Sequence, residues 1–548
     1  MLCGVAGRTN AGATFAPWHS VSYSFSLSVS WRRSWRATVE STRMERFYIT
    51  TPIYYVNSTP HIGHAYTTIA ADILVRNRRQ RGAETFFLTG VDEHAAKVAR
   101  VAAEQGLSPQ EYADQIAVVW RELPERLNAS NDFFIRTSDD AHKRFVQGFL
   151  QRLFDNGHIY QDVYSGLYCV GCEAFKTDAD LVDGKCPEHD SAPDWIEERN
   201  WFFRLSSFQQ QLLDLYEQAD FVLPGFRANE AKSFIAGGLQ DFSISRAGQT
   251  WGIPIPWDPD SVAYVWADAL VNYLSALTYA RPGEDLVETF WPEVRHLLAK
   301  DILRFHCVYW PAMLLGAGYE PPRQLFVHGY LLLDDRKISK SLGNVVDPLD
   351  LIDVYGVDPV RFWCARAVSF GQDGAASIVG VHERYERELG NDLGNLLSRT
   401  TAMVARYRSG TLRAVMSPEG AVAGALAPLA ADVAARLDDF DITGALERIW
   451  EVVRLLNREV ETTAPWQLAK DPLRADDLDR VLYDLVDGLR VVAVVLAAYV
   501  PATAVAILEA ICQPPALDWA QVAYGLTGET TGIEASPPLF PRLDSPVE

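Results

Sequence analysis

Two short clusters of potentially cationic side chains, far apart along the chain, are the residues best suited to chemistry. The first is His61–His64, with a histidine at each end, and the second is Lys337–Ser341, which contains Lys337 and Lys340. Attack on the α-phosphate of a nucleoside triphosphate spreads negative charge over the phosphorus oxygens, so donors are needed on opposite sides of the triphosphate. Imidazoles on one side and ammonium groups on the other would supply them. The two clusters therefore predict a site that activates the α-phosphate of ATP.

Each cluster taken by itself is more often structural. A His-x-x-His at a turn is usually a surface or core pair, and most Lys-x-x-Lys-Ser runs are solvated loops. The two commonest rival nucleotide sites are missing, because the sequence shows neither a Gly-x-x-x-x-Gly-Lys-Ser/Thr loop nor a Gly-x-Gly-x-x-Gly after a strand. The order of the two clusters, each near the end of a predicted strand, favours catalysis.

The elements around the histidines are those of a β-α-β unit. Residues 47–52 and 85–89 are predicted strands, and apolar periodicity predicts a helix that starts at Ile62 and is ended by Gly82. The histidines thus fall at a strand-to-helix turn, where backbone N–H groups and the helix dipole favour phosphate. Gly63, which has no side chain, would let a flat base approach the backbone.

The lysine cluster has a similar context. It follows an extended segment, residues 324–331, and precedes a helix predicted to begin near Asp347. We expect the polar loop between these two elements to close over a substrate.

These clusters resemble the paired signature motifs of the class I aminoacyl-tRNA synthetases. Residues 51–57, which lead into the histidines, and residues 89–94 are similar to the methionyl-tRNA synthetase family in particular, from about Met44 through the helical region. Ile338 departs from the family, which usually has methionine there. The resemblance implies that methionine and ATP form methionyl-adenylate and pyrophosphate, and that methionine then passes to the 3′ end of tRNA(Met), including the initiator tRNA.

The resemblance also implies roles for individual residues. His61 and His64 would contact the phosphates in the adenylation transition state, Lys337 and Lys340 would hold the pyrophosphate, and Mg²⁺ would accompany ATP. The ATP contacts that it implies are Gly63, Asp301, His328, Gly329 and Lys340. For Asp301, near a helix start, a capping role is the alternative.

A pocket for methionine should be aromatic, because the substrate side chain is long, apolar and polarizable. The resemblance places Asp92 against the substrate ammonium group, in a charge-assisted pairing. It lines the rest of the pocket with Ile53, Tyr55, Trp266, Leu270, Tyr273, Phe305 and His306. The family often has proline at the position of Leu270, and without the resemblance these aromatic residues would be read as ordinary core.

Cys169, Cys172, Cys186 and His189 form two ligand pairs, each separated by two residues and joined by a short polar loop. This spacing predicts one structural Zn²⁺ with all four positions filled by protein ligands. Disulfide pairing is the alternative, and it fits poorly with a large acidic chain whose remaining cysteines are scattered. In the family such a knuckle lies in a connective insertion between the halves of the nucleotide-binding fold.

Beyond about residue 385 the sequence becomes rich in Ala and Leu, and helical periodicity runs through residues 428–437, 445–460 and 478–500. Asn395, Arg399 and Arg406 would share one helix face. By resemblance this helical bundle binds the anticodon, with Asn395 and Arg399 reading bases and Trp466 stacking on one. A solvated helix face and a packed tryptophan are the alternatives.

The predicted fold class is α/β, with a Rossmann-like parallel-sheet catalytic domain that carries a zinc-bearing connective insertion and is followed by an α-helical anticodon-binding bundle. We expect six regions along the chain, in order an N-terminal extension, the first catalytic half, the insertion, the second catalytic half, the lysine-loop and stem-contact region, and the helical domain. Their predicted boundaries are 1–43, 44–160, 161–261, 262–336, 337–384 and 385–548.

Bulk properties agree with this organisation. A chain of 548 residues, 48% hydrophobic, can bury several cores. Its formal net charge of −21 disfavours nonspecific nucleic-acid binding, although a local basic track can still bind tRNA. No apolar run is long enough to span a bilayer, so we expect no membrane association.

Three other functions fit this sequence less well. The chain lacks room for the large editing domain of the isoleucine, leucine and valine enzymes. A cysteine enzyme would need a zinc ligand on the first strand, and no cysteine lies between Cys3 and Cys169. A noncatalytic RNA-binding paralogue is the alternative from another class, and retention of all four phosphate-handling residues argues against it.

Residues 1–43 are rich in Ser and Arg and contain one acidic residue, Glu40. Such a composition suits a transit peptide, which would make the protein organellar, or a start assigned upstream of Met44. We expect the second, a disordered segment and a cytoplasmic protein. We also expect a monomer, because the chain ends without the appended tRNA-binding module of dimeric relatives.

Overall fold

The computed structural model describes residues 44–56, 59–169, 174–176, 178–187, 190–333, 336–337, 346–375 and 377–543. The chain divides into two units, Met1–Met44 and Glu45–Glu548, and all elements named below belong to the second. The extension that we predicted to be disordered, residues 1–43, lies outside the described residues.

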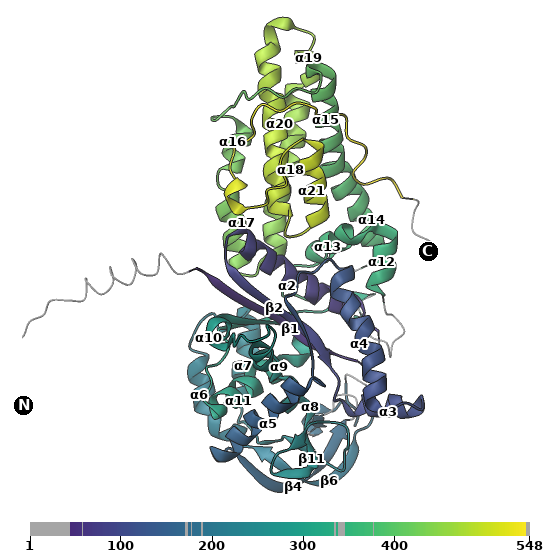
Figure 1. The fold of residues 1–548 in the computed structure, drawn as a ribbon, viewed down its shortest axis with the longest axis vertical. Helices are drawn as coiled ribbons and strands as arrows, with labels where there is room; N and C mark the ends of the chain where they lie inside the picture. The colour runs from purple at the N-terminus through teal and green to yellow at the C-terminus, as the bar shows by residue number, and fades with distance from the viewer. Residues whose placement is uncertain are drawn as a thin grey trace, which may run out of the picture. The chain divides into compact units, whose positions relative to one another are not determined.

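A six-stranded sheet in the order β3-β2-β1-β12-β13-β7 forms the centre of the second unit (Figure 1). Every neighbouring pair in it is parallel, so the carboxyl ends of all the strands lie at one edge. Its strands are β1 (Arg46–Tyr55), β2 (Glu84–Asp92), β3 (Phe133–Arg136), β7 (Val222–Leu223), β12 (Val294–Ala299) and β13 (Gln324–His328). The Rossmann-like sheet predicted from sequence is confirmed.

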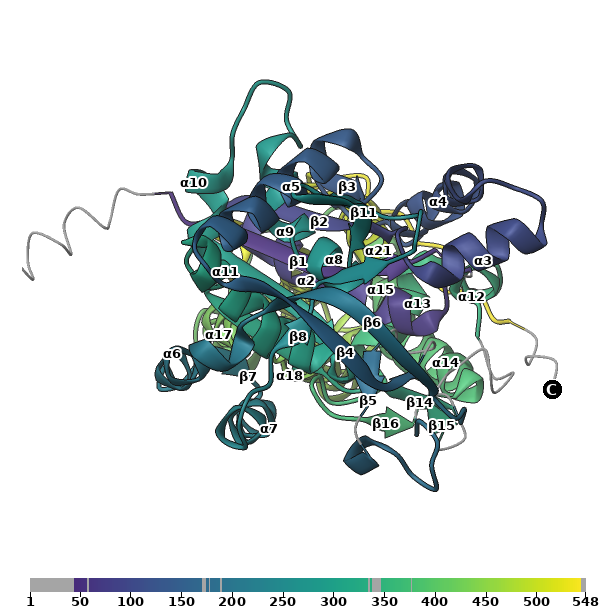
Figure 2. The same cartoon turned by 90° about the horizontal axis from the view of Figure 1, so that it is seen from below.

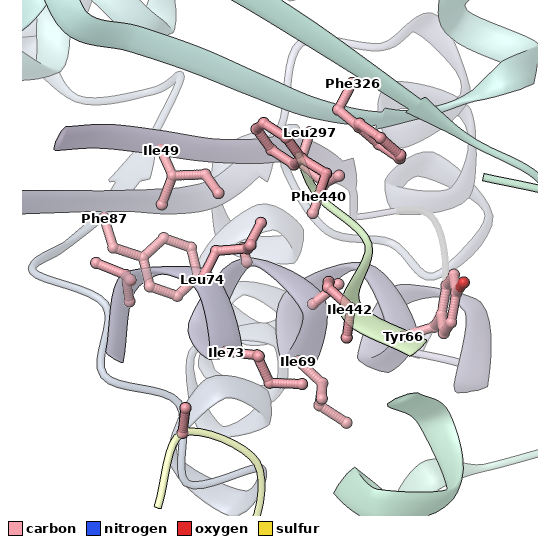
Figure 3. Close-up of a cluster of buried hydrophobic side chains, with 14 of the residues drawn as sticks. Ile49, Tyr66, Ile69, Ile73, Leu74, Phe87, Leu297, Phe326, Phe440 and Ile442 are labelled. Carbon is pink, nitrogen blue, oxygen red and sulfur yellow. The ribbon is translucent and has the colours of Figure 1, made fainter. Parts of the chain in front are cut away.

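Helix α2 (Ile62–Gln80) covers one face of this sheet and ends before Gly82, whose φ of +84° favours glycine. Leu74 of this helix points toward the strands and lies beside Ile49 and Phe87, whereas Ile69 and Ile73 lie on the opposite side of the helix and are buried as well (Figure 3). Each such side chain contributes about 1.5–3 kcal/mol when fully buried. The β-α-β unit predicted around the histidines is therefore present.

The same core continues into the helical region. Phe440 stacks on Phe326 of β13 with ring centroids 4.8 Å apart, and Ile442 lies beside the α2 side chains (Figure 3). The sheet and the helical bundle thus share one hydrophobic core.

Further helices surround the sheet. They are α3 (Ala96–Glu104), α4 (Pro109–Arg126), α5 (Asp140–Asp155), α6 (Gln209–Leu215), α7 (Gly225–Ala236), α8 (Val265–Ala269), α9 (Asn272–Ser275), α10 (Val287–Phe290) and α11 (Trp310–Ala317).

An antiparallel sheet in the order β5-β4-β6-β8 occupies part of the predicted insertion, with β4 and β6 side by side in Figure 2. Its strands are β4 (Ile159–Cys169), β5 (Ala174–Lys176), β6 (Asp194–Phe203) and β8 (Phe242–Ser243). A smaller sheet contains β9 (Ser245–Ala247), β10 (Pro254–Ile255) and β11 (Asp258–Ala263). Strand β7 also falls within residues 161–261, yet it extends the main sheet.

The lysine-cluster region forms a third small sheet. It contains β14 (Leu331–Leu333), β15 (Arg336–Lys337) and β16 (Gly374–Ala375). Two helices, α12 (Pro348–Tyr355) and α13 (Val357–Arg366), lie between β15 and β16 in the sequence. Asp347 caps α12 by accepting from the Leu349 N–H at 2.8 Å, which confirms the predicted helix start.

The C-terminal region is helical, as predicted. Its elements are α14 (Ile378–Arg384), the π-helix η8 (Tyr385–Gly394), α15 (Asn395–Arg408), α16 (Ala421–Leu426), α17 (Leu429–Asp438), α18 (Ile442–Thr463), α19 (Pro465–Leu468), α20 (Ala475–Leu496) and α21 (Pro501–Ala510). Pro501 stands after the predicted helix run and also opens α21, a helix that the sequence reading missed. Among the described residues, no helix is long and apolar enough to cross a membrane.

Arg361 of α13 connects the helical region to α2, the helix that packs on the six-stranded sheet. Its side chain is fully buried, and four of its five N–H donors form hydrogen bonds to backbone carbonyls. Nε donates to the Tyr499 carbonyl at 2.8 Å, Nη2 to the Ala498 carbonyl at 2.9 Å, and Nη1 to the carbonyls of Leu127 and Asn128 at 3.0 and 3.3 Å.

The remaining donor of Arg361 pairs with Asp72 of α2, at 2.7 Å between Nη2 and Oδ2. Asp72 also accepts from Arg76 and from the N–H and hydroxyl of Ser130. Burial alone would raise the pKa of Asp72, but Arg361 and Arg76 outweigh it and hold that pKa below its ordinary value. One buried ion pair therefore joins α2, α13, the end of α4 and the end of α20.

Arg361→Met should lower the free energy of unfolding by about 3 kcal/mol or more, because it leaves the Asp72 carboxylate buried beside several unsatisfied carbonyls. Urea unfolding followed by circular dichroism measures the change. Lys232→Met is the matched control, since Lys232 pairs with Glu217 in water, and it should cost less than about 1 kcal/mol. Equal losses in the two variants would contradict this reading.

Candidate active site

The predicted catalytic histidines build the N-terminus of α2. His61 is its N-cap, and His61 Nδ1 accepts from the Gly63 N–H at 3.1 Å. His64 Nδ1 accepts from the His61 N–H at 3.0 Å, and the two rings stack with centroids 3.7 Å apart. A backbone N–H only donates, so each neutral ring carries its proton on Nε2. Both imidazoles can therefore donate from Nε2 at a helix N-terminus, a position that favours phosphate.

Two aromatic rings fix the orientation of His64. Tyr54 and Trp120 each meet its ring edge-on at 4.8 Å, and they stack on each other at 5.1 Å. Trp120 lies on α4, whose end is hydrogen-bonded to Arg361. A Cβ on Gly63 would stand 3.0 Å from His61 Cε1, so glycine here also leaves room for the capping ring.

Only the first residue of the lysine cluster lies within the described part of the chain. Lys337 lies in β15, opposite Leu332 of β14, and the description resumes at Val346. The Val346 carbonyl accepts from the Ile62 N–H at 3.0 Å, so Val346 lies at the N-terminus of α2. Lys340 itself lies outside the described residues, and so does the Lys337 side chain.

Three of the predicted ATP contacts lie at or just after the carboxyl ends of β12 and β13. Asp301 is exposed in the 3₁₀ turn Lys300–Ile302 that follows β12. His328 is buried, with Nε2 2.8 Å from the Thr67 hydroxyl of α2 and Nδ1 2.8 Å from the Gly329 carbonyl, and burial lowers its pKa. A Cβ on Gly329 would stand 2.3 Å from the Gln372 backbone, so this glycine is required by protein packing.

The predicted methionine-binding residues come together beside this edge. Trp266 of α8 stacks on Phe305 with centroids 3.9 Å apart and an interplanar angle of 6°, and it meets the rings of Tyr55 and His306 edge-on. Asp92 ends β2, pairs in register with Tyr55, and is 2% exposed. Leu270 and Tyr273 are buried, and Ile53 is half-buried.

Hydrogen bonds define the tautomer of His306, and burial determines its charge. Its Nδ1 donates to the Ile302 carbonyl at 3.0 Å, because a carbonyl only accepts, so Nε2 accepts from the Tyr273 hydroxyl at 2.7 Å. Burial lowers the pKa of His306 to about 4, which keeps the ring neutral at pH 7. The wall of the pocket formed by Tyr273 and His306 is therefore uncharged.

Sequence reasoning missed several buried polar residues around this pocket. His296 of β12 accepts at Nε2 from the Trp310 indole at 3.2 Å and donates from Nδ1 to the Thr50 hydroxyl at 2.8 Å. His94, His142 and Asp268 form a second buried cluster. The sequence could have pointed to two of these buried residues, because His94 lies in the family-like segment 89–94 and Asp268 lies between Trp266 and Leu270.

The predicted zinc ligands are only partly described. Cys169 and Cys186 are buried, and neither forms a disulfide with a described cysteine. Cys169 pairs with Ala174 across a tight hairpin, and the Cys186 N–H bonds to the Ser191 carbonyl at 2.9 Å across a second turn. Cys172 and His189 lie outside the described residues, and within those residues no three potential ligands gather around a metal position.

The predicted anticodon-binding residues lie on two helices that both pack against α20. Asn395 and Arg406 are exposed on α15, Arg399 is half-buried there, and Trp466 of α19 is 38% exposed. The exposed fraction of Trp466 leaves part of its ring available to a nucleobase, so simple core packing does not describe it.

The lowered pKa of His306 predicts a pH dependence of stability. Because the unfolded state takes up this proton near pH 6.5 and the folded state near pH 4, the free energy of unfolding is highest above pH 6.5 and falls as the pH drops through this window. His306 alone should contribute about 2 kcal/mol of loss between pH 7 and pH 5. In His306→Gln, which keeps an acceptor for Tyr273, the free energy of unfolding measured in urea should fall by about 2 kcal/mol less than in the wild type between pH 7 and pH 5. Parallel curves for the two proteins would contradict the assignment.

Comparisons with known proteins agree with this geometry. The family described as "tRNA synthetases class I (M)" matches residues 47–194 and 180–401. The methionine–tRNA ligase of Caldanaerobacter subterraneus is 42% identical over 503 residues, covering 91% of this chain and 79% of that protein. That of Streptomyces coelicolor is 39% identical over 533 residues, covering 92% and 98%.

A solved structure is similar along nearly the whole described chain. It is Mycobacterium tuberculosis methionyl-tRNA synthetase in complex with methionyl-adenylate, with a TM-score of 0.86 and 38% identity, covering 91% of this chain and 100% of that one. The chain therefore belongs to the methionyl-tRNA synthetase family of class I aminoacyl-tRNA synthetases, and its activity is that of a methionine–tRNA ligase.

Proposed function

We propose that methionine is adenylated at the carboxyl edge of the parallel sheet and is then transferred to the 3′ end of tRNA(Met), including the initiator tRNA. The observation that carries this proposal is the pair of Nε2 donors of His61 and His64 at the N-terminus of α2. Val346, which follows the lysine cluster in the sequence, lies beside them. The two clusters would then supply donors to one triphosphate.

In adenylation, a carboxylate oxygen of methionine attacks the α-phosphorus of ATP, and pyrophosphate leaves with the electrons of the broken P–O bond. His61 and His64 donate to phosphate oxygens as their charge rises, while Lys337 and Lys340 hold the pyrophosphate. Mg²⁺ accompanies ATP, as in class I synthetases generally, and supplies charge neutralisation. Asp301 and the backbone at Gly329 would contact the nucleoside.

Methionine is selected by one charge and several rings. Asp92 would take the ammonium group at the end of β2, and the nearly dry surroundings of this carboxylate strengthen the pairing. The stacked Trp266 and Phe305 rings would contact the thioether, which polarizable aromatic edges accommodate well. The neutral His306 adds no charge to that wall.

A structural Zn²⁺ is proposed for Cys169, Cys172, Cys186 and His189. The donor set fits, because both described cysteines are buried and each is followed after two residues by another candidate ligand in the sequence. The metal would hold the two ligand-bearing segments of the insertion together. It has no role in adenylation.

tRNA(Met) would be recognised through its anticodon by Asn395, Arg399 and Trp466 on the exposed surface of the bundle. Such specific contacts suit a protein with a formal net charge of −21, which repels nucleic acid without a local basic track. A monomeric, cytoplasmic protein without membrane association stays the prediction made from the sequence.

Two substitutions at His64 separate its structural role from its catalytic role. His64→Asn places an oxygen near the Nδ1 position and keeps the bond to the His61 N–H, but it removes the Nε2 donor. His64→Gln places an N–H near the Nε2 position. In methionine-dependent pyrophosphate–ATP exchange, His64→Asn should lower kcat by about a hundredfold or more, with a melting temperature near that of the wild type, and His64→Gln should lose less.

Equal loss in both His64 variants, or a loss explained by unfolding, would overturn the donor role of Nε2. Absence of methionine-dependent exchange in the wild type would overturn the proposed function itself and favour a noncatalytic RNA-binding protein.

Trp466→Ala should raise KM for tRNA(Met) in aminoacylation by about tenfold, because stacking on a base contributes about 1–3 kcal/mol. Pyrophosphate exchange, which needs no tRNA, should be unchanged. Leu473→Ala is the matched control, since Leu473 is 94% exposed on the same part of the bundle and is expected to have no effect. Loss of exchange in Trp466→Ala would assign this ring to the core.

A further inference from the structure

A buried cluster of ionisable groups lies beside the methionine-binding residues. Asp268 Oδ2 is 2.5 Å from His94 Nδ1, and Asp268 Oδ1 is 2.7 Å from His142 Nε2. His142 Nδ1 is in turn 2.7 Å from the Ser275 hydroxyl. The side chains of all three ionisable residues are at most 1% exposed. We call His94, Asp268 and His142 the triad.

The triad is held together by charge. Burial raises the pKa of Asp268, but His94 and His142 outweigh burial and hold the pKa below its ordinary value, so the carboxylate is ionised. An ionised carboxylate only accepts hydrogen bonds, so His94 donates from Nδ1 and His142 donates from Nε2. Both oxygens of Asp268 are therefore used, each by a different element of the fold.

Two members of the triad stand next to residues with a proposed role in methionine recognition. His94 lies two residues after Asp92, and Asp268 lies two residues after Trp266. Helix α8, which carries Trp266 and Asp268, has five residues and no side-chain N-cap, so it is too short to be stable without tertiary contacts. Asp268 supplies such a contact, and it restrains the rotation of α8 that sets the direction of the Trp266 ring.

The segment after β2 is fixed in the same way. The Glu93 carbonyl accepts from the Trp251 indole at 2.5 Å, and Glu93 Oε1 accepts from Arg136 at 2.8 Å. The Trp251 ring also meets His94 edge-on at 5.1 Å. His94 adds the connection that joins this segment directly to α8, while His142 joins α8 to α5.

We propose that the triad positions Asp92 and Trp266 relative to each other, so that it sets the affinity for the amino acid without touching the substrate. His94, His142 and Asp268 are thus positioning residues. The inference rests on the proposed function, since it concerns the same pocket. A role in general stability alone would leave the affinity of correctly folded molecules unchanged.

The test is methionine-dependent pyrophosphate–ATP exchange, with KM for methionine, KM for ATP and kcat measured separately. His94→Ala, His142→Ala and Asp268→Asn should each raise KM for methionine about tenfold or more, with kcat and KM for ATP within about threefold of the wild type. A structural role alone would reduce the active fraction, which lowers kcat and leaves both KM values unchanged.

Conservative variants provide the rescue. His94→Asn places an amide N–H near the Nδ1 position, and His142→Gln places one near the Nε2 position, so both keep the donor to Asp268. Each should return KM for methionine to within about threefold of the wild type. Conservative variants as impaired as the alanine variants would overturn the proposal, and so would unchanged KM for methionine in His94→Ala and His142→Ala.

Two further variants keep the test decisive. Asp487→Asn, at a buried carboxylate that accepts from Arg490 at 2.9 Å in the helical bundle, is the matched control and should lower the melting temperature without changing KM for methionine. Ser275→Ala removes only the outer hydroxyl, and it should raise KM for methionine about fivefold, beyond the range allowed for the conservative variants, even if alanine at a histidine prevents folding. An unchanged KM in Ser275→Ala would then overturn the proposal. A wild type without exchange activity would instead refute the proposed function.

Discussion

The buried guanidinium of Arg361 is the contact on which the arrangement of the whole second unit depends. A charge removed from water needs partners for its donors, and here those partners come from three separate parts of the chain, the Asp72 carboxylate on α2 and backbone carbonyls at the ends of α4 and α20. Asp72 lies on the helix whose N-terminus is built by His61 and His64, and α4 carries Trp120, which packs on His64. The helical bundle and the N-terminus of α2 therefore cannot move independently without breaking this pair.

The histidines of the site show how the same side chain is adapted to two tasks by its hydrogen bonds. At the N-terminus of α2, backbone N–H groups occupy Nδ1 of His61 and His64, which directs the Nε2 protons to an incoming anion. In the methionine pocket, a carbonyl occupies Nδ1 of His306 and leaves Nε2 as an acceptor for Tyr273, while burial suppresses its charge. The proposed phosphate-binding end therefore presents Nε2 donors, and the proposed methionine-binding end presents an uncharged wall.

Much of the fold could be predicted from local patterns. Elements with strong periodicity or capping chemistry were predicted and are present. They are the strands around residues 47–52 and 85–89, the helix from Ile62 to before Gly82, the helix start at Asp347 and the long helices of the bundle. Short elements were harder, because β7 has two residues and α8 has five, too few for a period to be detected. Helix α21 was missed because Pro501 is as compatible with a helix start as with the end of the preceding one.

Residue types and spacing alone were enough to single out the His61–His64 and Lys337–Ser341 clusters as candidates for phosphate binding, together with two pairs of candidate metal ligands, because these depend on chemistry carried within a few neighbouring residues. The residues of the predicted methionine pocket came from the family resemblance. Contacts between distant segments could not be read in this way. Several features depend on atoms that only the folded backbone brings together. They are the tautomers of His64 and His306, the partners of Arg361, the close packing at Gly329 and the contacts of Asp268 with His94 and His142. Hydrogen bonds and buried charges act over a few ångströms in space, and a linear pattern carries no record of which remote residue will occupy that space.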